Sequence, residues 1–316
     1  MRVTENTNYE TIREGLHRSK DRLDNLQLQS ATLRKLNHPS DDPVGSAKVL
    51  ELRTEKENYE QFLRNGQIAR SFLDSTDHAL GDLSDMIMRC KEIAINQASS
   101  PNSSEEARLS VSEELGQLFQ QAVAVANRKL GDRFLFGGYK TLRPPVDSEG
   151  VYHGDDGQQM IEIANEVFIS MNIPGSEGFN TQPKPSNYSQ GTPPSEKEDA
   201  HTDLENVNLF EAIRKIRIAV LAGDIGNVRN ALDDFDRLQS KMISLRAKVG
   251  ARIQGLQITE RSLERHGLTN SALSSTIEDA DMVQVVNDMG KEETVFKSAL
   301  ASSRRLIQPT LLDFLK

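Results

Sequence analysis

Residues 38–45 read HPSDDPVG, a polar run of acids and prolines that separates two long stretches of repeating apolar residues. Proline fits the first turn of a helix, where its missing N–H costs nothing, but it disfavours helical geometry in the residue before it. The run therefore predicts that one helix stops here and that another begins at Pro43. Ser40, Asp41, Asp42 and Pro43 are the candidate hinge and cap residues. Asp42 or Ser40 is expected to accept hydrogen bonds from the first N–H groups of the second helix.

Before the hinge, apolar residues recur at the alternating spacings of four and three that mark a heptad repeat. The predicted N-terminal seam is Ile12, Leu16, Leu23, Leu26 and Leu33, with Ser19 and Ser30 at the intervening positions. Such a seam forms one narrow stripe along a helix and needs a partner helix to bury it. Because two positions are serine, this helix is not expected to be stable alone.

The other end of the chain carries the same repeat. The predicted C-terminal seam is Met282, Val286, Met289, Phe296, Leu300 and Ile307, with Glu293 and Ser303 in between, and an apolar tail adds Leu311, Leu312 and Phe314. The run Ser275–Asp279 places hydroxyls three residues before acids, which is typical of a capping box and predicts a helix start. The two one-sided seams are expected to pack on each other or on copies from neighbouring molecules.

The middle of the chain predicts long helices. A heptad stripe supports a helix over about 43–98, a second helix runs to about 130, and a third carries apolar residues from Val228 to Leu263. At about 1.5 Å per residue, helices of this kind would be roughly 60–80 Å long. The expected fold class is mainly α: a long antiparallel helical rod, a coiled-coil-like bundle of N- and C-terminal segments, with a small β-rich inserted domain.

Glycine, proline and alternating apolar residues between about 134 and 205 indicate the inserted β-rich part. Asn165–Glu166 is a predicted turn between two strands, and residues 154–157 (GDDG) are interpreted as a hairpin turn rather than a calcium loop. Residues 180–203 are polar and proline-rich, and a mobile loop is expected there. The predicted segments are 1–40, an assembly helix disordered in the monomer; 41–133, a helical half-rod; 134–205, the insertion; 206–274, the other half-rod; and 275–316, the C-terminal assembly helix.

The chemistry of a catalytic site is missing from the sequence. The six histidines are scattered, the pair Asp41–Asp42 has no apolar pocket or second base, and no phosphate-binding or nucleophile motif occurs. We therefore expect no enzyme activity, no cofactor and no metal. The net charge of −9 argues against nucleic-acid binding, and no apolar run is long enough to insert in a membrane. Cys90, the single cysteine, excludes an intrachain disulfide and is interpreted as a small core residue.

Several stretches together resemble a known family. LDNLQLQSATLRKLNHPSDDPVGSAKVLELR, RNGQIARSFLDSTDHAL, GDRFLFGGYKT and IEDADMVQVVNDMGKEETVFKSALASSRRLIQPTLLDFL cover about 1–140 and 240–316. They are similar to the flagellin superfamily, and the Pro-Ser-Asp-Asp-Pro form of the hinge resembles its hook–filament junction branch, the FlgL type (hook-associated protein 3). The sequence departs from that branch at Ser30–Arg34, where junction relatives usually show Ile-Ser-Thr-Gly-Lys.

The resemblance implies a structural protein that forms an adaptor ring between the flagellar hook and filament. It implies export through the flagellar type III channel, so the chain would be cytoplasmic before export and extracellular, in the flagellum, afterwards. The implied partners are other copies in a ring, a neighbouring hook-associated protein, filament flagellin, and a cytoplasmic export chaperone that holds the C-terminal helix. A filament flagellin is the nearest alternative, and a cytoplasmic coiled-coil scaffold protein is a more distant one.

Overall fold

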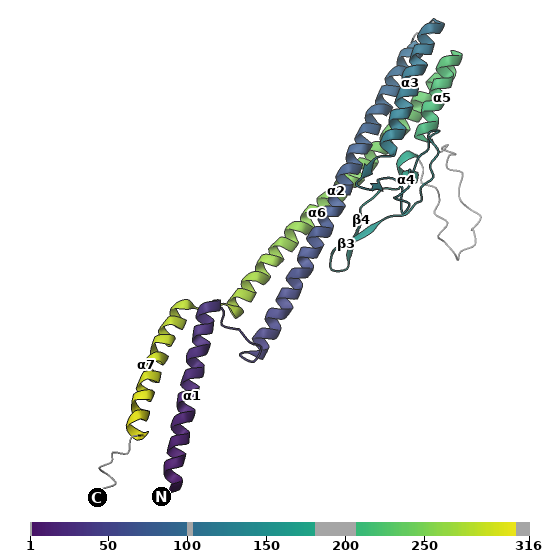
Figure 1. Cartoon of the computed structure of the whole chain (residues 1–316). Coiled ribbons are helices and arrows are strands. Elements are labelled where there is room, and N and C mark those ends of the chain that lie inside the picture. Colours follow the sequence, from purple (N-terminus) through teal and green to yellow (C-terminus); the bar gives the residue numbers. More distant parts are fainter. Residues whose placement is uncertain (1, 100–103, 181–206, 308–316) are drawn as a thin grey trace, which may run out of the picture. The chain divides into compact units, whose positions relative to one another are not determined.

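The computed structural model describes residues 2–99, 104–180 and 207–307, and for 2–9 and 304–307 it describes only the backbone. Helices dominate this part of the chain: α1 (Arg2–Thr32), α2 (Pro43–Ser99), α3 (Glu105–Ala126), α4 (Gly175–Phe179), α5 (Leu209–Ala222), α6 (Ile225–Glu278) and α7 (Met282–Ile307). The strands are β1 (Lys129–Leu130), β2 (Arg133–Phe134), β3 (Met160–Ala164) and β4 (Val167–Ser170). The predicted fold class, long helices with a small β part, is confirmed (Figure 1).

The chain divides into two compact units, residues 61–263 and residues 1–60 together with 264–316. In the first unit α2 and α6 lie side by side and run antiparallel (Figure 1). Gln239 Nε2 donates to Ser84 Oγ at 2.9 Å, and the Arg246 guanidinium lies 3.1 Å from Asp77, so later residues of α6 meet earlier residues of α2. Residues of α3 and α5 pack against each other alongside them.

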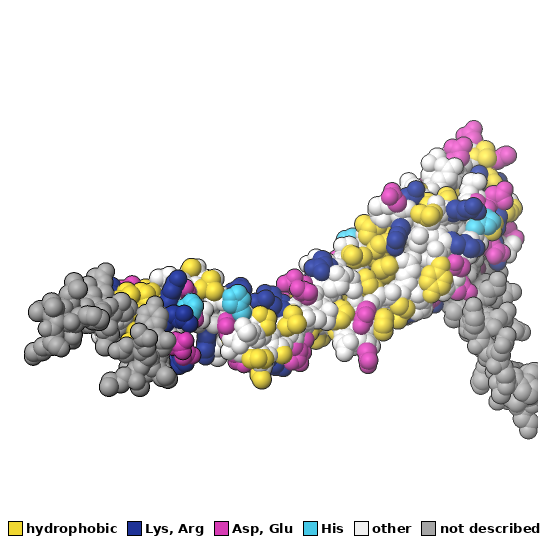
Figure 2. Space-filling model, turned by 60° about the horizontal axis from the view of Figure 1, so that its bottom comes forward, with side chains coloured by type: hydrophobic (Ala, Val, Ile, Leu, Met, Phe, Trp, Pro, Cys, Tyr) yellow, Lys and Arg dark blue, Asp and Glu magenta, His cyan; other side chains and the backbone are white. Residues whose placement is uncertain are grey.

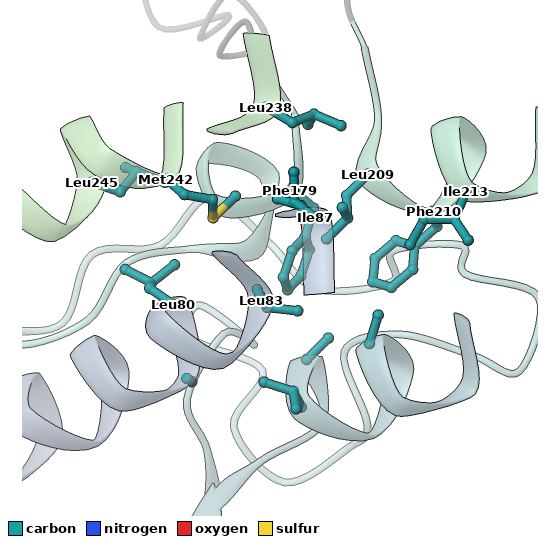
Figure 3. Packing of buried hydrophobic residues seen from close by; sticks show 14 of the residues in the cluster. Leu80, Leu83, Ile87, Phe179, Leu209, Phe210, Ile213, Leu238, Met242 and Leu245 are labelled. Atoms are coloured by element: carbon teal, nitrogen blue, oxygen red, sulfur yellow. The ribbon is translucent and has the colours of Figure 1, made fainter. Parts of the chain in front are cut away.

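The core of this unit is built from aliphatic stripes of the long helices and a cluster of phenylalanines. Figure 3 shows Leu80, Leu83 and Ile87 of α2 facing Leu238, Met242 and Leu245 of α6, with Phe210 of α5 beside them. Phe179 of α4 has its ring centroid 5.3 Å from those of both Phe136 and Phe210. The inserted region is therefore held to the helices by aromatic packing, a contact of about 0.5–1.5 kcal/mol per ring pair beyond area burial.

The insertion contains less strand than predicted. Its two sheets have two strands each, β1–β2 and β3–β4, and most of residues 135–159 form loops. The predicted turn at Asn165–Glu166 is confirmed, because β3 and β4 are antiparallel and Ala164 pairs with Val167. The predicted hairpin turn at 154–157 is wrong: these residues form an extended loop in which Asp155 Oδ1 accepts from Tyr139 N at 2.6 Å. The predicted loop at 180–203 lies almost wholly outside the described residues.

One tight turn explains how the loops reach the core. Asp147 Oδ1 accepts hydrogen bonds from Glu149 N at 2.9 Å and Val151 N at 2.8 Å, and Gly150 follows the turn with φ +83°. A Cβ at Gly150 would lie 2.6 Å from Cβ of Phe210. Only glycine combines that dihedral with that close approach.

Two helix boundaries differ from the prediction. The segment Ser275–Asp279 does not start a helix, since α6 continues to Glu278 and α7 begins at Met282. Asp281 Oδ1 accepts from Val283 N at 2.9 Å, so the cap of α7 is Asp281. In addition, the predicted half-rod from 206 contains two helices, because Gly223 ends α5 in the left-handed region with φ +68°.

Candidate assembly interface

The second unit contains the two helices that carry the predicted seams. α1 and α7 lie side by side in antiparallel orientation (Figure 1). Arg22 Nη1 donates to Glu292 Oε1 at 3.3 Å across the pair. Within a single chain the two terminal helices therefore pack on each other, which is the first of the two arrangements expected from the sequence.

On α1 the predicted seam faces α7 along most of its length. Ile12, Leu16, Leu23 and Leu26 are half-buried, and Ser19 between them is buried. Leu33 is the exception. It lies beyond the end of α1, has φ +60° and is 56% exposed, so it is not part of the stripe that α1 turns toward α7, and its role in assembly stays a prediction. The helix ends at Thr32, before the repeat does.

On α7 the buried stripe is shifted from the predicted one. Met282, Met289 and Phe296 are half-buried as the seam requires, but Val286 is 51% exposed and Leu300 is 41% exposed. The buried or half-buried positions that alternate with them are Val285, Glu292 and Ala299, whereas Ser303 is buried and Glu293 is half-buried at the positions that the predicted repeat gave them. Val286 and Leu300 therefore lie on a flank of the stripe that is buried within one chain, and their place in an assembly seam stays a prediction. The side chain of Ile307, and all of Leu311, Leu312 and Phe314, lie outside the described part of the chain.

The stripe between α1 and α7 is weak in two ways. Most of its apolar side chains are only half-buried. The hydroxyl of Ser19 is also buried without a hydrogen-bond partner among the described residues, which costs about 1–3 kcal/mol. By itself this pair gains little free energy from burial.

Two connectors hold the ends of the four helices in this unit. The connector from α1 to α2 is residues 33–42, and that from α6 to α7 is residues 279–281. Lys35 N donates to the carbonyl of Glu278 at 2.7 Å, and Ala280 N donates to the carbonyl of Leu33 at 3.1 Å. Glu278 is only 7% exposed, and its Oε1 forms ion pairs with Arg34 Nη1 at 2.8 Å and with Arg53 Nη2 at 2.5 Å. One carboxylate thus ties both connectors to α2.

The hinge is organised by its two aspartates. Asp42 Oδ1 accepts from Val44 N at 3.1 Å and Gly45 N at 3.0 Å, which makes Asp42 the cap of α2. Asp41 Oδ2 accepts from Asn37 N at 3.2 Å and from His38 N at 2.9 Å, so it closes the connector turn. Pro43 is the first residue of α2, and Ser40 is exposed beside it.

These contacts were only partly visible in the sequence. Proline and aspartate signal the hinge by their local chemistry. Glu278, Arg34 and Arg53 carry no such signal, because charged residues on helices are usually solvated. Their roles depend on chain segments that meet only in the fold.

The described residues contain neither a cluster of metal ligands nor a membrane-spanning helix. In residues 2–99, 104–180 and 207–307 no group of three or more histidine, cysteine or acidic side chains could hold a metal ion. Within the same ranges, no helix has both the length and the apolar character needed to cross a membrane. On the face in Figure 2, basic, acidic and apolar side chains are interspersed.

Comparison with known proteins agrees with this arrangement. Residues 3–141 match the family described as the bacterial flagellin N-terminal helical region. The flagellar hook-associated protein 3 of Salmonella typhimurium is 22% identical over 95% of each chain. The flagellin of Listeria monocytogenes is 22% identical over 95% of this chain and 94% of its own. A solved flagellar hook-associated protein from Vibrio parahaemolyticus superposes with a TM-score of 0.63 at 18% identity, covering 76% of this chain and all of its own.

Over most of its length this chain is similar to flagellar hook-associated protein 3 and to flagellins, and residues 3–141 match the flagellin N-terminal family. The predicted resemblance to the hook-associated protein 3 (FlgL) type is confirmed, and so is the prediction of a structural protein of the bacterial flagellum. In this chain the paired helices α1 and α7, the connectors and the hinge form the candidate assembly interface.

Proposed function

We propose that this protein forms an adaptor ring at the junction of the flagellar hook and filament. The observation that carries the proposal is the helix pair α1–α7, whose apolar side chains stay half-buried within one chain. Packing against neighbouring copies would complete their burial, at about 25 cal/mol for each Å² removed from water. In this ring the protein would contact a neighbouring hook-associated protein on one side and filament flagellin on the other.

Assembly has to offset the conformational entropy that is lost when these helices become ordered. Fixing a backbone costs about 1–2 kcal/mol per residue, and the half-buried stripe of a single chain gains little free energy from apolar burial. We infer that α1 and α7 are disordered in the free monomer and become ordered when copies pack together. The exposed flank residues Val286 and Leu300 would then be covered by neighbours rather than by α1.

The proposal includes export by the flagellar type III pathway. A single buried cysteine, Cys90, leaves the chain without an intrachain disulfide that would have to be opened for passage through a narrow channel. A cytoplasmic chaperone would hold residues 275–316 until export. It would cover the stripe around Met289 and Phe296 that faces α1, so chaperone binding and α1–α7 pairing would exclude each other.

Deletion of the gene in the bacterium that carries it tests the proposal. Bare hooks with filament subunits released into the medium are the expected result, and re-expression of the protein should restore attached filaments. If the deletion removed a major filament protein without such release, the chain would be a filament flagellin instead. Attached, normal filaments in the deletion strain, after any second copy of the gene has also been removed, would overturn the flagellar proposal.

A further inference from the structure

A basic surface stands out on this acidic chain. The sequence from 128 to 143 holds Arg128, Lys129, Arg133, Lys140 and Arg143 but only one acid, Asp132, whereas the whole chain has a net charge of −9. We call the exposed members of this region, with two apolar neighbours, the basic loop surface: Lys129, Arg133, Tyr139, Lys140, Leu142 and Arg143. Tyr139 is 67% exposed and Leu142 is 78% exposed, so both offer apolar area to a partner.

The basic loop surface is held in a fixed shape. Phe134 N donates to the carbonyl of Thr141 at 2.9 Å, which brings the 139–143 loop against β2. The hydroxyl of Tyr139 donates to the carbonyl of Gln158 at 3.1 Å. Arg128 is paired with Asp82. In contrast, within residues 2–99, 104–180 and 207–307 neither Arg133 nor Arg143 has an ion-pair partner.

A second surface on the same unit has the opposite charge. The β3–β4 hairpin exposes Met160 by 56%, Val167 by 48% and Phe168 by 58%, with Glu162 and Glu166 beside them. Glu162 pairs with Phe168 across the strands. We call these five residues the hairpin surface. Its inner side is fixed to the unit, because Ile163 is buried and Asn65 Nδ2 of α2 donates to the carbonyl of Glu162 at 2.8 Å.

We propose that the basic loop surface of one copy binds the hairpin surface of a second copy of this chain. Each surface combines exposed apolar side chains with charged ones, as protein interfaces do, and the charges of the two surfaces have opposite signs. Neither Glu162 nor Glu166 has an ion pair with a base among the described residues, so the charges of both surfaces are available to a partner. The rest of the chain is acidic, which makes the basic surface the natural acceptor for another copy.

The contact is head-to-tail, because two different surfaces of one chain meet. Repeated from copy to copy, such a contact closes into a ring or continues as a helix. The inference rests on the proposed ring and adds to it a lateral contact in the unit of residues 61–263, apart from the terminal helices.

Cysteine cross-linking in isolated flagella tests the contact directly. The native Cys90 is buried, and burial raises the pKa of its thiol to about 12, so background reaction is small. The variants Leu142→Cys and Phe168→Cys are produced separately and together in one cell, then oxidised. Covalent dimers are expected only in the mixed sample, in which the two cysteines can come from different copies.

Dimers from either variant alone would overturn the head-to-tail contact, since like surfaces would then be meeting. Absence of dimers from the mixed sample, with both variants present in the flagella, would overturn the lateral contact but not the junction ring. Linkage of either cysteine to a flagellar protein of different mass would also overturn it. If neither variant were found in flagella although both fold, the junction proposal itself would fail.

A charge exchange provides the independent check. Arg133→Glu with Arg143→Glu, or Glu166→Lys alone, should each reduce the dimer yield by about tenfold or more, because like charges then face each other. All three changes combined should restore most of the yield. These side chains are exposed, so helical content measured by circular dichroism should be unchanged. No recovery in the combined variant would contradict the pairing of these two surfaces.

Discussion

Glu278 is the only charged side chain that the fold buries among the described residues. Removing a carboxylate from water costs free energy, and the ion pairs of Glu278 with Arg34 and Arg53 offset that cost. Glu278 is the last residue of α6, directly before the connector to α7. Both arginines are about half exposed, so the pairs are weaker than fully buried ones. The two ion pairs contribute mainly by fixing positions: they hold the connector that follows α1 and the end of α6, which precedes α7, against α2.

Glu278→Ala should therefore weaken the assembled state. We expect a loss of about 1–3 kcal/mol, seen as release of the protein from isolated flagella at a lower temperature than the wild type. Glu278→Gln keeps the shape of the side chain and one acceptor oxygen, so its release temperature should lie between those of the wild type and Glu278→Ala. Equal release temperatures for all three proteins would show that the two ion pairs do not hold the connectors.

The hinge offers a matched pair of substitutions. Asp42→Ala removes the acceptor of the Val44 and Gly45 N–H groups, whereas Ser40→Ala changes an exposed residue of the same hinge. Loss of a helix cap costs about 1 kcal/mol, or about fivefold in an opening equilibrium. Amide exchange at residues 44 and 45 should be about fivefold faster in Asp42→Ala and unchanged in Ser40→Ala. The opposite order would assign the cap to Ser40.

At the scale of the helix, α7 shows how periodicity can be correct and its register wrong. The sequence has valine at both 285 and 286, and either one continues a heptad that includes Met282 and Met289. Apolar spacing alone could not separate the two stripes. The structure selects the stripe that brings the small residue Ala299, rather than Leu300, toward α1, where close packing of two helices is possible.

The two adjacent valines test this register. Val285→Asp places a carboxylate in a position that is 6% exposed, and burying an unpaired charge costs several kcal/mol. Val286→Asp makes the same chemical change at a position that is 51% exposed. Because Val286 would be covered only by neighbouring copies, we expect the amount of protein retained on isolated flagella to fall in both variants, and to fall further in Val285→Asp. Equal or reversed losses would favour the stripe predicted from the sequence.

The helix boundaries show a second limit of local sequence signals. Ser275–Asp279 has the composition of a capping box, yet it forms the last turn of α6, where Ser275 Oγ donates to Asp279. The true cap, Asp281, is one acid among several in the same segment. By contrast, Pro43 and Asp42 were predictable, because proline restricts the chain whatever surrounds it.

For the whole molecule, burial differs sharply between the two units. Residues 61–263 contain a core in which Leu73, Leu83, Phe136, Phe210 and Phe235 are almost fully buried. This core depends on tertiary contacts that sequence periodicity does not predict, such as the tilted and edge-on packing of Phe179 against Phe136 and Phe210. In the terminal pair α1–α7, by comparison, the seam is half-buried and one buried hydroxyl is unpaired.

This difference predicts where the free monomer is ordered. Protection of amides follows the free energy of local opening, which is lowest where few apolar groups are buried. In the monomer, amides before about residue 40 and after about residue 275 should exchange within seconds, whereas those of α2 and α6 around the core should be protected for hours. In isolated flagella the terminal amides should become protected as well, because neighbouring copies then cover the seams. Strong protection of α1 and α7 in the monomer would mean that the pair is stable by itself, and assembly would have to draw its free energy from other surfaces.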